Sequence, residues 1–328
     1  MSIVQIEDEK KAINIQILLA TYNGEKYLDE QLESLISQTR APDKIIVSDD
    51  NSKDSTWEKL LKWQASYPLL FEVHKNESKR HGHCGNFANL CELAKKGEGD
   101  YFLFSDQDDV WHKNKIERLL KVSNQEQANL PASEPYLIHS DLKVVNEDLE
   151  EMSPSFFNFQ GLPRPEQLTF PRFLIQNNIT GCASFFNRAL LEKASPIPSG
   201  ITNHDWWFGL VAYKFGKLVF LEESLISYRQ HCANALGAEK KGRALSFTMV
   251  KKLFALKQHF RNSHTQARCL LDIKGSPKSL EHQEAVLNFV KLPKQSLSSK
   301  AKICKRLANN PNSWLELLVF FSVVLTLR

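Results

Sequence analysis

The chain has 328 residues, of which 42% are apolar and 24% are charged. This composition is typical of a folded protein and excludes a disordered one. The 42 Lys and Arg residues exceed the 38 Asp and Glu residues by a net charge of only +4, which is too small an excess to predict a nucleic-acid partner. The length accommodates one large α/β domain, expected over residues 1–238, and a helical extension over 239–328.

The cysteines and the chain ends predict where the protein resides. The six cysteines form no CxxC pair and no zinc-ligand spacing, so we expect reduced thiols in a cytosol. Residues 1–12 are charged and lack a long apolar core. No signal peptide is therefore expected, and the protein should stay on the side of the membrane where it is made. The apolar stretch 314–327 is shorter than the roughly 20 residues of a membrane helix, which favours a surface-lying or docked helix.

Strands alternate with helices over the first 123 residues. The pattern predicts strands at 13–20, 44–48, 71–74 and 101–104, followed in turn by helices at 27–36, 56–63, 86–96 and 115–123. This alternation predicts a mostly parallel sheet with helices on both faces. Ligands of such sheets bind at the carboxyl ends of the strands, where the acidic clusters 49–50 and 106–109 fall.

The second half is less regular. Strands are expected at 136–145, 182–186 and 217–221, an irregular Pro-rich stretch at 153–171, and a helix from about residue 205. Helical periodicity follows to the end. Within 245–260, apolar positions interleave with Lys251, Lys252 and Lys257, an amphipathic basic pattern that suits either an anionic cytoplasmic membrane surface or packing against the domain.

Asp106 and Asp108 form a DxD motif directly after a predicted strand. Two carboxylates separated by one residue project to the same side of an extended chain, where they can share a divalent cation. Magnesium or manganese would then bridge phosphate oxygens and offset the charge of a leaving nucleoside diphosphate. The alternative is that these residues only cap the next helix.

The ordered motifs resemble those of the family 2 glycosyltransferases. They are LLATYNGEKYLDEQLESLISQT, KIIVSDDNSKDST, NFANL and YFLFSDQDDVWHKNKI, and the resemblance covers roughly residues 13–235. It implies a GT-A fold, with a nucleotide-sugar-binding half over 13–123 and an acceptor-binding half over 124–238. It also implies a nucleotide-sugar donor and a Mg²⁺ or Mn²⁺ cofactor.

On the donor side, the resemblance places Thr21 and Tyr22 in a turn that lines the nucleoside pocket. Asp50 matches the position that binds the base or ribose, and a carboxylate there can accept a hydrogen bond from a pyrimidine imide N–H. For Asp49 two alternatives stay open, a role at the nucleotide and a helix cap. Asn86 follows a Gly-containing donor loop, in which glycine allows close approach of backbone to ligand. The basic residues beside it either meet the diphosphate or are simply solvated; they are Lys75, Arg80, His81 and His83.

The resemblance places Asp106 and Asp108 as the metal-binding pair, with Asp106 also at the donor. Asp109 is a third carboxylate or a helix cap. Tyr228-Arg229-Gln230-His231 resembles a signature of rhamnosyltransferase-like members. There His231 completes the metal shell or touches the diphosphate, the alternative being a structural histidine. Arg229 contacts the donor phosphate or forms an internal ion pair.

Asp205 aligns with the catalytic aspartate, which takes the proton of the acceptor hydroxyl. Trp206 and Trp207 beside it are core or sugar-stacking residues. Four other residues resemble the acceptor-side wall or face the donor sugar, with capped turns as the alternative; they are Asn178, Thr180, Gly181 and Asp141.

These features together predict a metal-dependent, inverting glycosyltransferase of bacterial surface polysaccharide synthesis, at the inner face of the cytoplasmic membrane. The donor is expected to be a UDP- or dTDP-sugar, with rhamnose favoured as the sugar. Both nucleotides stay open because their bases offer the same imide edge. The acceptor is expected to be a glycan or a lipid-linked glycan. A catalytically inactive GT-A scaffold is the alternative. A nucleotidyltransferase is disfavoured because Thr21-Tyr22-Asn23-Gly24 is not a Gly-rich phosphate loop.

Overall fold

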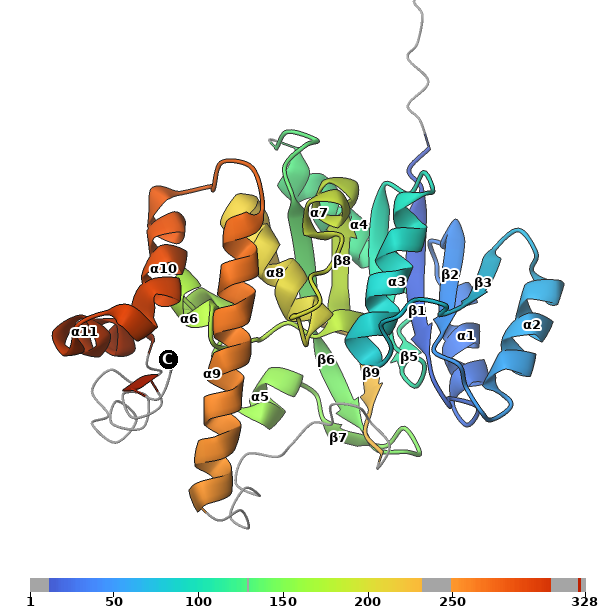
Figure 1. The fold of residues 1–328 in the computed structure, drawn as a ribbon. Helices are drawn as coiled ribbons and strands as arrows, with labels where there is room; N and C mark the ends of the chain where they lie inside the picture. Colours follow the sequence, from blue (N-terminus) through green and yellow to red (C-terminus); the bar gives the residue numbers. More distant parts are fainter. Residues whose placement is uncertain (1–11, 129, 232–248, 308–323, 326–328) are drawn as a thin grey trace, which may run out of the picture.

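The computed structural model describes residues 12–128, 130–231, 249–307 and 324–325. Their strands form a nine-stranded sheet in the order β3-β2-β1-β4-β8-β6-β9-β5, with β7 paired to β6, and helices cover both of its faces (Figure 1). The strands are β1 (Ile15–Thr21), β2 (Lys44–Asp49), β3 (Phe71–Lys75), β4 (Tyr101–Ser105), β5 (Val110–Trp111), β6 (Tyr136–Val145), β7 (Glu151–Ser153), β8 (Ser184–Asn187) and β9 (Lys217–Arg229).

The first four strands form the predicted parallel sheet. β1 lies at its centre, paired in parallel with β2 and β4, and β2 pairs in parallel with β3. β1 and β2 are continuous runs of buried, mostly apolar residues, as expected for strands covered on both faces. Their parallel direction brings the carboxyl ends of β1, β2 and β4 to one edge of the sheet.

Beyond β4 the sheet is mixed. β8 runs antiparallel to both β4 and β6, β9 runs parallel to β6, and β5 runs antiparallel to β9. The predicted strand at 217–221 extends to Arg229 because β6 offers a long partner, with register shifts around Asp141. This extension brings Tyr228 and Arg229 to the turn after β4. The short strands β5 and β7 were not predicted.

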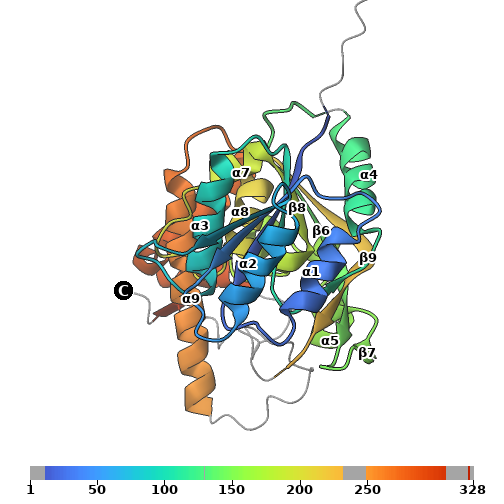
Figure 2. The same cartoon turned by 90° about the vertical axis from the view of Figure 1, so that its right-hand side faces the viewer.

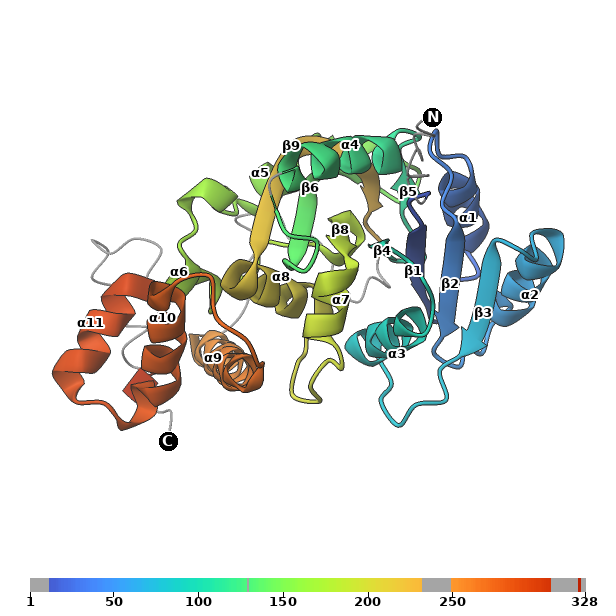
Figure 3. The same cartoon turned by 90° about the horizontal axis from the view of Figure 1, so that it is seen from above.

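The helices divide between the two sheet faces, as Figure 2 and Figure 3 show: α1 and α4 lie on one side, and α3, α7 and α8 on the other. Each face has its own apolar core. The helices are α1 (Leu28–Ile36), α2 (Thr56–Ser66), α3 (His83–Lys95), α4 (Lys115–Gln127), α5 (Phe156–Gln160), α6 (Phe170–Phe173), α7 (Arg188–Ala194), α8 (His204–Phe215), α9 (Met249–Asp272), α10 (Leu280–Lys291) and α11 (Leu297–Leu307).

Two predicted boundaries differ for local reasons. α3 begins at His83 rather than Asn86, because Gly82 at its N-cap adopts a φ of 78° and so ends the preceding turn early. The stretch 153–171, predicted to be irregular, contains α5 and α6. Ser155 caps α5 by accepting a hydrogen bond from the Asn158 backbone N–H.

The C-terminal helices pack beside α8 and α6 at one end of the molecule (Figure 1). Phe260, Ala267 and Leu270 of α9 are fully buried, so packing against the domain, one of the two predicted alternatives, is observed for the C-terminal part of this helix. Phe254, nearer its start, is 69% exposed. No helix among the described residues is both long and apolar enough to cross a membrane. The predicted boundary at 238, residues 245–248 of the amphipathic pattern and most of 314–327 lie outside the described residues.

Candidate active site

A cavity of about 900 Å³ lies at the carboxyl ends of β1, β2 and β4, where parallel sheets bind their ligands. Its lining extends across to α5, to the loop before β8 and to the start of α8. Seven of the predicted site residues line it, and they are Thr21, Tyr22, Asp50, Asn86, Asp106, Asp108 and Asp205. Arg229 and His231 lie behind this lining.

Asp50 is held rigidly at one end of the cavity. Its Oδ2 accepts a hydrogen bond from the Gly82 backbone N–H at 2.7 Å, and its Oδ1 lies 2.8 Å from both Asn76 Nδ2 and His81 Nδ1. Asn86 joins this end to the sheet, because its Nδ2 donates to the Ser48 carbonyl oxygen at 2.8 Å. These bonds fix the position of the Asp50 carboxylate at this end of the cavity.

The turn after β1 is tied to the turn after β4 by Gln107, which sequence reasoning did not single out. The Gln107 amide accepts from the Tyr22 backbone N–H at 2.8 Å and donates to the Tyr22 carbonyl oxygen at 3.0 Å. A Cβ atom at Gly24 would lie 2.2 Å from Gln107 Oε1, so a larger residue there would displace the Gln107 amide from these two hydrogen bonds. The signal available in the sequence was an amide placed between two acidic residues.

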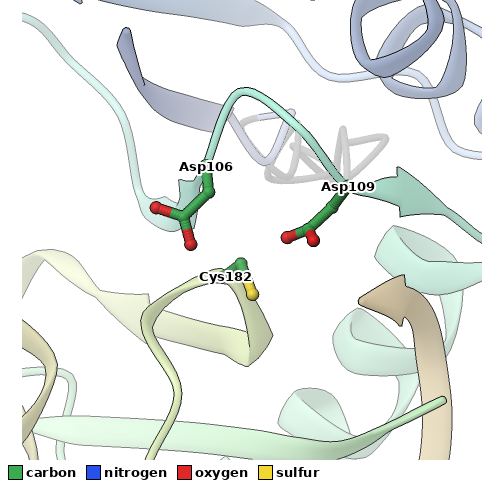
Figure 4. Close-up of side chains that lie close together, drawn as sticks. All are labelled: Asp106, Asp109 and Cys182. Carbon is green, nitrogen blue, oxygen red and sulfur yellow. The ribbon is translucent and has the colours of Figure 1, made fainter. Parts of the chain in front are cut away.

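Three carboxylates follow β4, and they lie close to several other titratable groups. Asp106 and Asp109 project toward Cys182, as Figure 4 shows, with their ligand atoms and its Sγ within 4.8 Å of one another. Asp108 Oδ2 lies 2.9 Å from His231 Nε2. Asp109 is fully buried, and its Oδ1 accepts from the Arg229 backbone N–H at 3.2 Å, so it connects this turn to β9.

The acidic cluster carries more negative charge than the neighbouring side chains compensate. Burial, together with the neighbouring charge of Asp108, raises the pKa of Asp106 to about 7, and burial raises the pKa of Asp109 well above its usual value. Carboxylates that repel one another in a partly dry site fit a hard divalent cation, which prefers oxygen ligands. The residues present therefore suit Mg²⁺ or Mn²⁺.

Lys115 lies behind this cluster, a placement with no signal in the sequence pattern. Its side chain is completely buried in α4, and Nζ donates to the Cys182 carbonyl oxygen at 2.6 Å and lies over the Trp111 ring. Burial lowers the pKa of Lys115 to about 7. The lysine thus anchors the 181–183 turn against the floor of the site.

Asp205 faces the cavity from the first turn of α8. Its Oδ1 accepts hydrogen bonds from the Trp206 backbone N–H at 2.6 Å and from Asn177 Nδ2 at 3.2 Å. Burial raises the pKa of Asp205 to about 6. A fixed carboxylate whose pKa lies close to neutrality is suited to act as a general base.

The neighbours of Asp205 are core residues. Trp206 and Trp207 are buried, and their indole N–H groups donate to the carbonyl oxygens of Phe173 and Ala194. The core alternative is therefore the one observed for both tryptophans. His204 stacks on Phe87 with ring centroids 3.7 Å apart, and burial holds its pKa well below the usual value.

Arg229 forms an internal ion pair, which is one of the two alternatives that the sequence left open for this residue. Its guanidinium is 3% exposed and pairs with Glu30, while Nε donates to the Asp108 carbonyl oxygen at 2.9 Å. These bonds lie behind the DxD turn, so they support its backbone. A direct contact between Arg229 and the donor stays a prediction, as does metal ligation by His231.

Of the basic residues predicted beside Asn86, two line the cavity and two are bonded elsewhere. His81 and His83 line the cavity, but Arg80 donates to the carbonyl oxygens of the 197–201 loop and Lys75 lies over the Trp57 ring.

Asp49 and Asp141 cap turns rather than facing the cavity. Asp49 accepts from the Ser52 backbone N–H at 2.9 Å, and Asp141 accepts from the Phe156 backbone N–H at 3.0 Å. A capped turn was the alternative stated for Asp141, whereas the helix cap stated for Asp49 is not what is observed, because Ser55 is at the N-cap of α2. By contrast, the three residues predicted for the acceptor-side wall do line the cavity, and they are Asn178, Thr180 and Gly181.

The sheet has a parallel part and a mixed part, and carboxylates after β4 line one cavity together with Asp205. This arrangement defines a glycosyltransferase of the GT-A type. Residues 16–194, more than half of the chain, match the family model described as Glycosyl transferase family 2. The chain therefore belongs to glycosyltransferase family 2.

Proteins of similar sequence carry names that agree with membership of this family. The chain is 28% identical over 230 residues to the dTDP-rhamnosyl transferase RfbG of Shigella flexneri, covering 67% of this chain and 74% of the relative. It is 25% identical over 258 residues to an uncharacterized glycosyltransferase of Methanocaldococcus jannaschii, covering 76% of this chain and 82% of the relative.

Solved structures share the fold. TarS 1-349 of S. aureus in complex with UDP-GlcNAc has a TM-score of 0.55 at 14% identity, covering 95% of this chain and 90% of that one. The mannosyltransferase PcManGT of Pyrobaculum calidifontis, in complex with GDP-Man and Mn²⁺, has a TM-score of 0.54 at 15% identity, covering 95% and 85%. At these identities the likeness concerns the fold alone.

Proposed function

We propose that this glycosyltransferase is metal-dependent and inverting, and that it transfers a sugar from a UDP- or dTDP-sugar to a hydroxyl of an acceptor glycan. The observation that carries the proposal is the position of Asp205, which faces the same cavity as Asp106 and Asp108 and has a pKa of about 6. A base and a cation-binding cluster on one cavity are what a single displacement at an anomeric carbon requires.

In the proposed reaction, Asp205 accepts the proton of the acceptor hydroxyl as that oxygen bonds to the anomeric carbon. The bond from this carbon to the diphosphate breaks on the opposite face, so the configuration inverts. Asp106 and Asp108, with His231 beside them, would hold Mg²⁺ or Mn²⁺, which supplies charge compensation for the leaving diphosphate. Asp50 accepts the imide N–H of a pyrimidine base, with Thr21, Tyr22 and Asn86 shaping that end of the cavity.

Rhamnose is the favoured sugar, and bacterial surface polysaccharide synthesis the favoured process. The similarity to a dTDP-rhamnosyl transferase supports both. Contact with the inner face of the cytoplasmic membrane is part of the same proposal. It is supported by exposed Phe254 on the part of α9 that extends beyond the domain (Figure 1), and by the exposed basic residue Arg261 further along this helix.

The direct test is nucleoside diphosphate release from a panel of UDP-, dTDP- and GDP-sugars with manganese or magnesium. We expect metal-dependent release from a UDP- or dTDP-sugar, because the carboxylate of Asp50 suits a pyrimidine imide. Product analysis by NMR should show the opposite anomeric configuration to that of the donor. Tight nucleotide binding without turnover, even with lipid-linked acceptors, would instead support the inactive scaffold.

The pH dependence of transfer provides a separate prediction. Because only the deprotonated form of Asp205 can accept a proton, and burial raises its pKa to about 6, kcat/KM should rise tenfold per pH unit below about pH 6 and level off above it. The measurement is initial rates between pH 5 and pH 8 at saturating metal. A kcat/KM that stays level down to pH 5, as an aspartate with an ordinary pKa near 4 would give, would contradict the role of this group.

A further inference from the structure

His231 is the one predicted metal ligand that does not come from the turn after β4. It follows β9, its side chain is 8% exposed, and its Nε2 lies 2.9 Å from Asp108 Oδ2. A hydrogen bond at one ring nitrogen does not by itself fix the plane of an imidazole, because the ring can turn about its bond to Cβ. The plane of the His231 ring therefore depends on what packs against its face.

Tyr27, at the N-cap of α1, packs against that ring. The centroids of the two rings are 4.9 Å apart, and their planes are inclined by 34°. The Arg229 guanidinium carbon lies 4.5 Å from the centroid of the same Tyr27 ring, and the Tyr27 hydroxyl donates to Glu147 Oε2 at 3.1 Å. Tyr27 is not among the described residues that line the cavity, so it can influence the metal site only through neighbours such as His231.

α1 connects Tyr27 rigidly to the turn that carries the DxD motif. The Tyr27 carbonyl oxygen accepts from the Gln31 backbone N–H at 3.1 Å, in the first turn of the helix. Gln31 Nε2 then donates to Ser105 Oγ at 2.8 Å, and both of these residues are fully buried. Ser105 is the last residue of β4 and directly precedes Asp106. Tyr27 therefore stands on an element whose position is fixed relative to the two carboxylates.

The hydroxyl of Tyr27 is held less firmly than its ring. Its partner Glu147 also pairs with Lys26 at 2.7 Å, but the side chains of Lys26 and Glu147 are 65% and 44% exposed. Ion pairs exposed to this degree contribute little. Loss of the hydroxyl should therefore matter less to His231 than loss of the ring.

We propose that Tyr27 is a positioning residue of the metal site, and that its ring sets the orientation in which His231 meets the ion together with Asp108. This inference rests on the proposed function, in which Asp106, Asp108 and His231 hold the metal. Groups that orient a metal-binding imidazole are typically worth about 10–100-fold in metal affinity or activity. Loss of the Tyr27 ring should weaken binding of the ion, whereas Asp50, at the other end of the cavity, should keep its hydrogen bonds.

The test measures binding of Mn²⁺ alone to the full chain, from the decrease of the EPR signal of the unbound ion, so that no turnover is needed. Tyr27→Ala is expected to raise the dissociation constant about tenfold or more. Tyr27→Phe keeps the ring and should stay within about threefold of the parent. If Tyr27→Ala folds poorly, Tyr27→Leu fills most of the space without a flat ring face and should give the same loss. Tyr67→Ala is the matched control, because it removes a ring that packs on Trp63 at the end of α2, and it should leave the dissociation constant unchanged.

A double-mutant cycle with His231→Ala separates positioning from a general role in folding. Asp106 and Asp108 remain in that background, so residual binding of Mn²⁺ can still be measured. If Tyr27 acts through His231, Tyr27→Ala should change the dissociation constant less than about twofold once the imidazole is absent. A tenfold loss that persists in the His231→Ala background would overturn the inference, as would an equal loss in Tyr67→Ala.

Affinity like that of the parent in folded Tyr27→Ala and Tyr27→Leu would also overturn the inference, and it would leave the metal site standing. Absence of Mn²⁺ binding by the parent protein, with and without a nucleoside diphosphate, would instead count against the proposed function, and the role of Tyr27 would fall with it.

Discussion

Replacing Asp205 with asparagine is expected to lower kcat by roughly 10²–10⁴-fold, the usual contribution of a positioned general base. Asparagine keeps the shape of the side chain and can still accept the hydrogen bond from the Trp206 backbone N–H, but it cannot take a proton. The measurement is nucleoside diphosphate release at saturating donor, acceptor and metal. Because binding of the nucleotide does not need the base, its affinity should change little.

The stability of this variant distinguishes lost chemistry from a damaged fold. The pKa of Asp205 is raised by burial from 3.8 to about 6, so the protonated group is favoured in the folded state. Its contribution to stability is complete below pH 3.8 and is lost as the pH rises through about 6. At pH 7.5 the neutral asparagine avoids that loss, and the melting temperature should be no lower than that of the parent. A kcat within tenfold of the parent would remove Asp205 from the mechanism.

Asp106→Asn and Asp108→Asn are each expected to abolish the response to manganese. Charge compensation of a leaving diphosphate is worth several kcal/mol, so kcat at a fixed metal concentration should fall roughly 100-fold or more. Asparagine at 108 can still accept a hydrogen bond from His231, which limits the structural disturbance. Activity assayed over a manganese titration gives both the apparent metal affinity and the maximal rate.

A thermal shift provides a readout independent of turnover. Manganese at about 100 times its dissociation constant stabilises a folded site by about 2.7 kcal/mol, which should raise the melting temperature of the parent protein by several degrees. Neither asparagine variant should show this shift. Asp148→Asn, which changes an exposed carboxylate on the β6–β7 connection, is the matched control and should keep both the shift and the activity. An undiminished shift in Asp106→Asn and in Asp108→Asn would place the metal elsewhere.

The strands of the parallel half were predictable because their pattern is local. Each of the buried runs at 15–21 and 44–49 is apolar on both faces, and the helix after each shows its own period. The long β9 was only half predicted, since Glu222, Glu223 and Ser224 interrupt its apolar pattern. Glu222 and Glu223 lie at a register shift, and the strand continues because Ser224 and the residues after it pair with β6 again, a non-local contact that the local pattern does not contain.

The candidate site shows the same division between residues identified from their local pattern and residues whose role depends on non-local contacts. Asp50, Asp106 and Asp108 follow strands directly, and Asp205 opens a helix, so each was identified from its local setting. Gln107, which ties the turns after β1 and β4, and Lys115, which anchors the 181–183 turn, were not identified. Their partners lie 85 and 67 residues away along the chain.

The sequence by itself determined the order of strands and helices in the parallel half, the acidic turns after β2 and β4, and the family to which the chain belongs, because these depend on residue types at short spacing. The tertiary structure alone decided that Arg229 pairs with Glu30 behind the DxD turn, and that Asp205 faces Asp106 across one cavity. The physical reason is that burial and the approach of distant groups set the charge state and the partners of a side chain, and both arise only when the chain has folded.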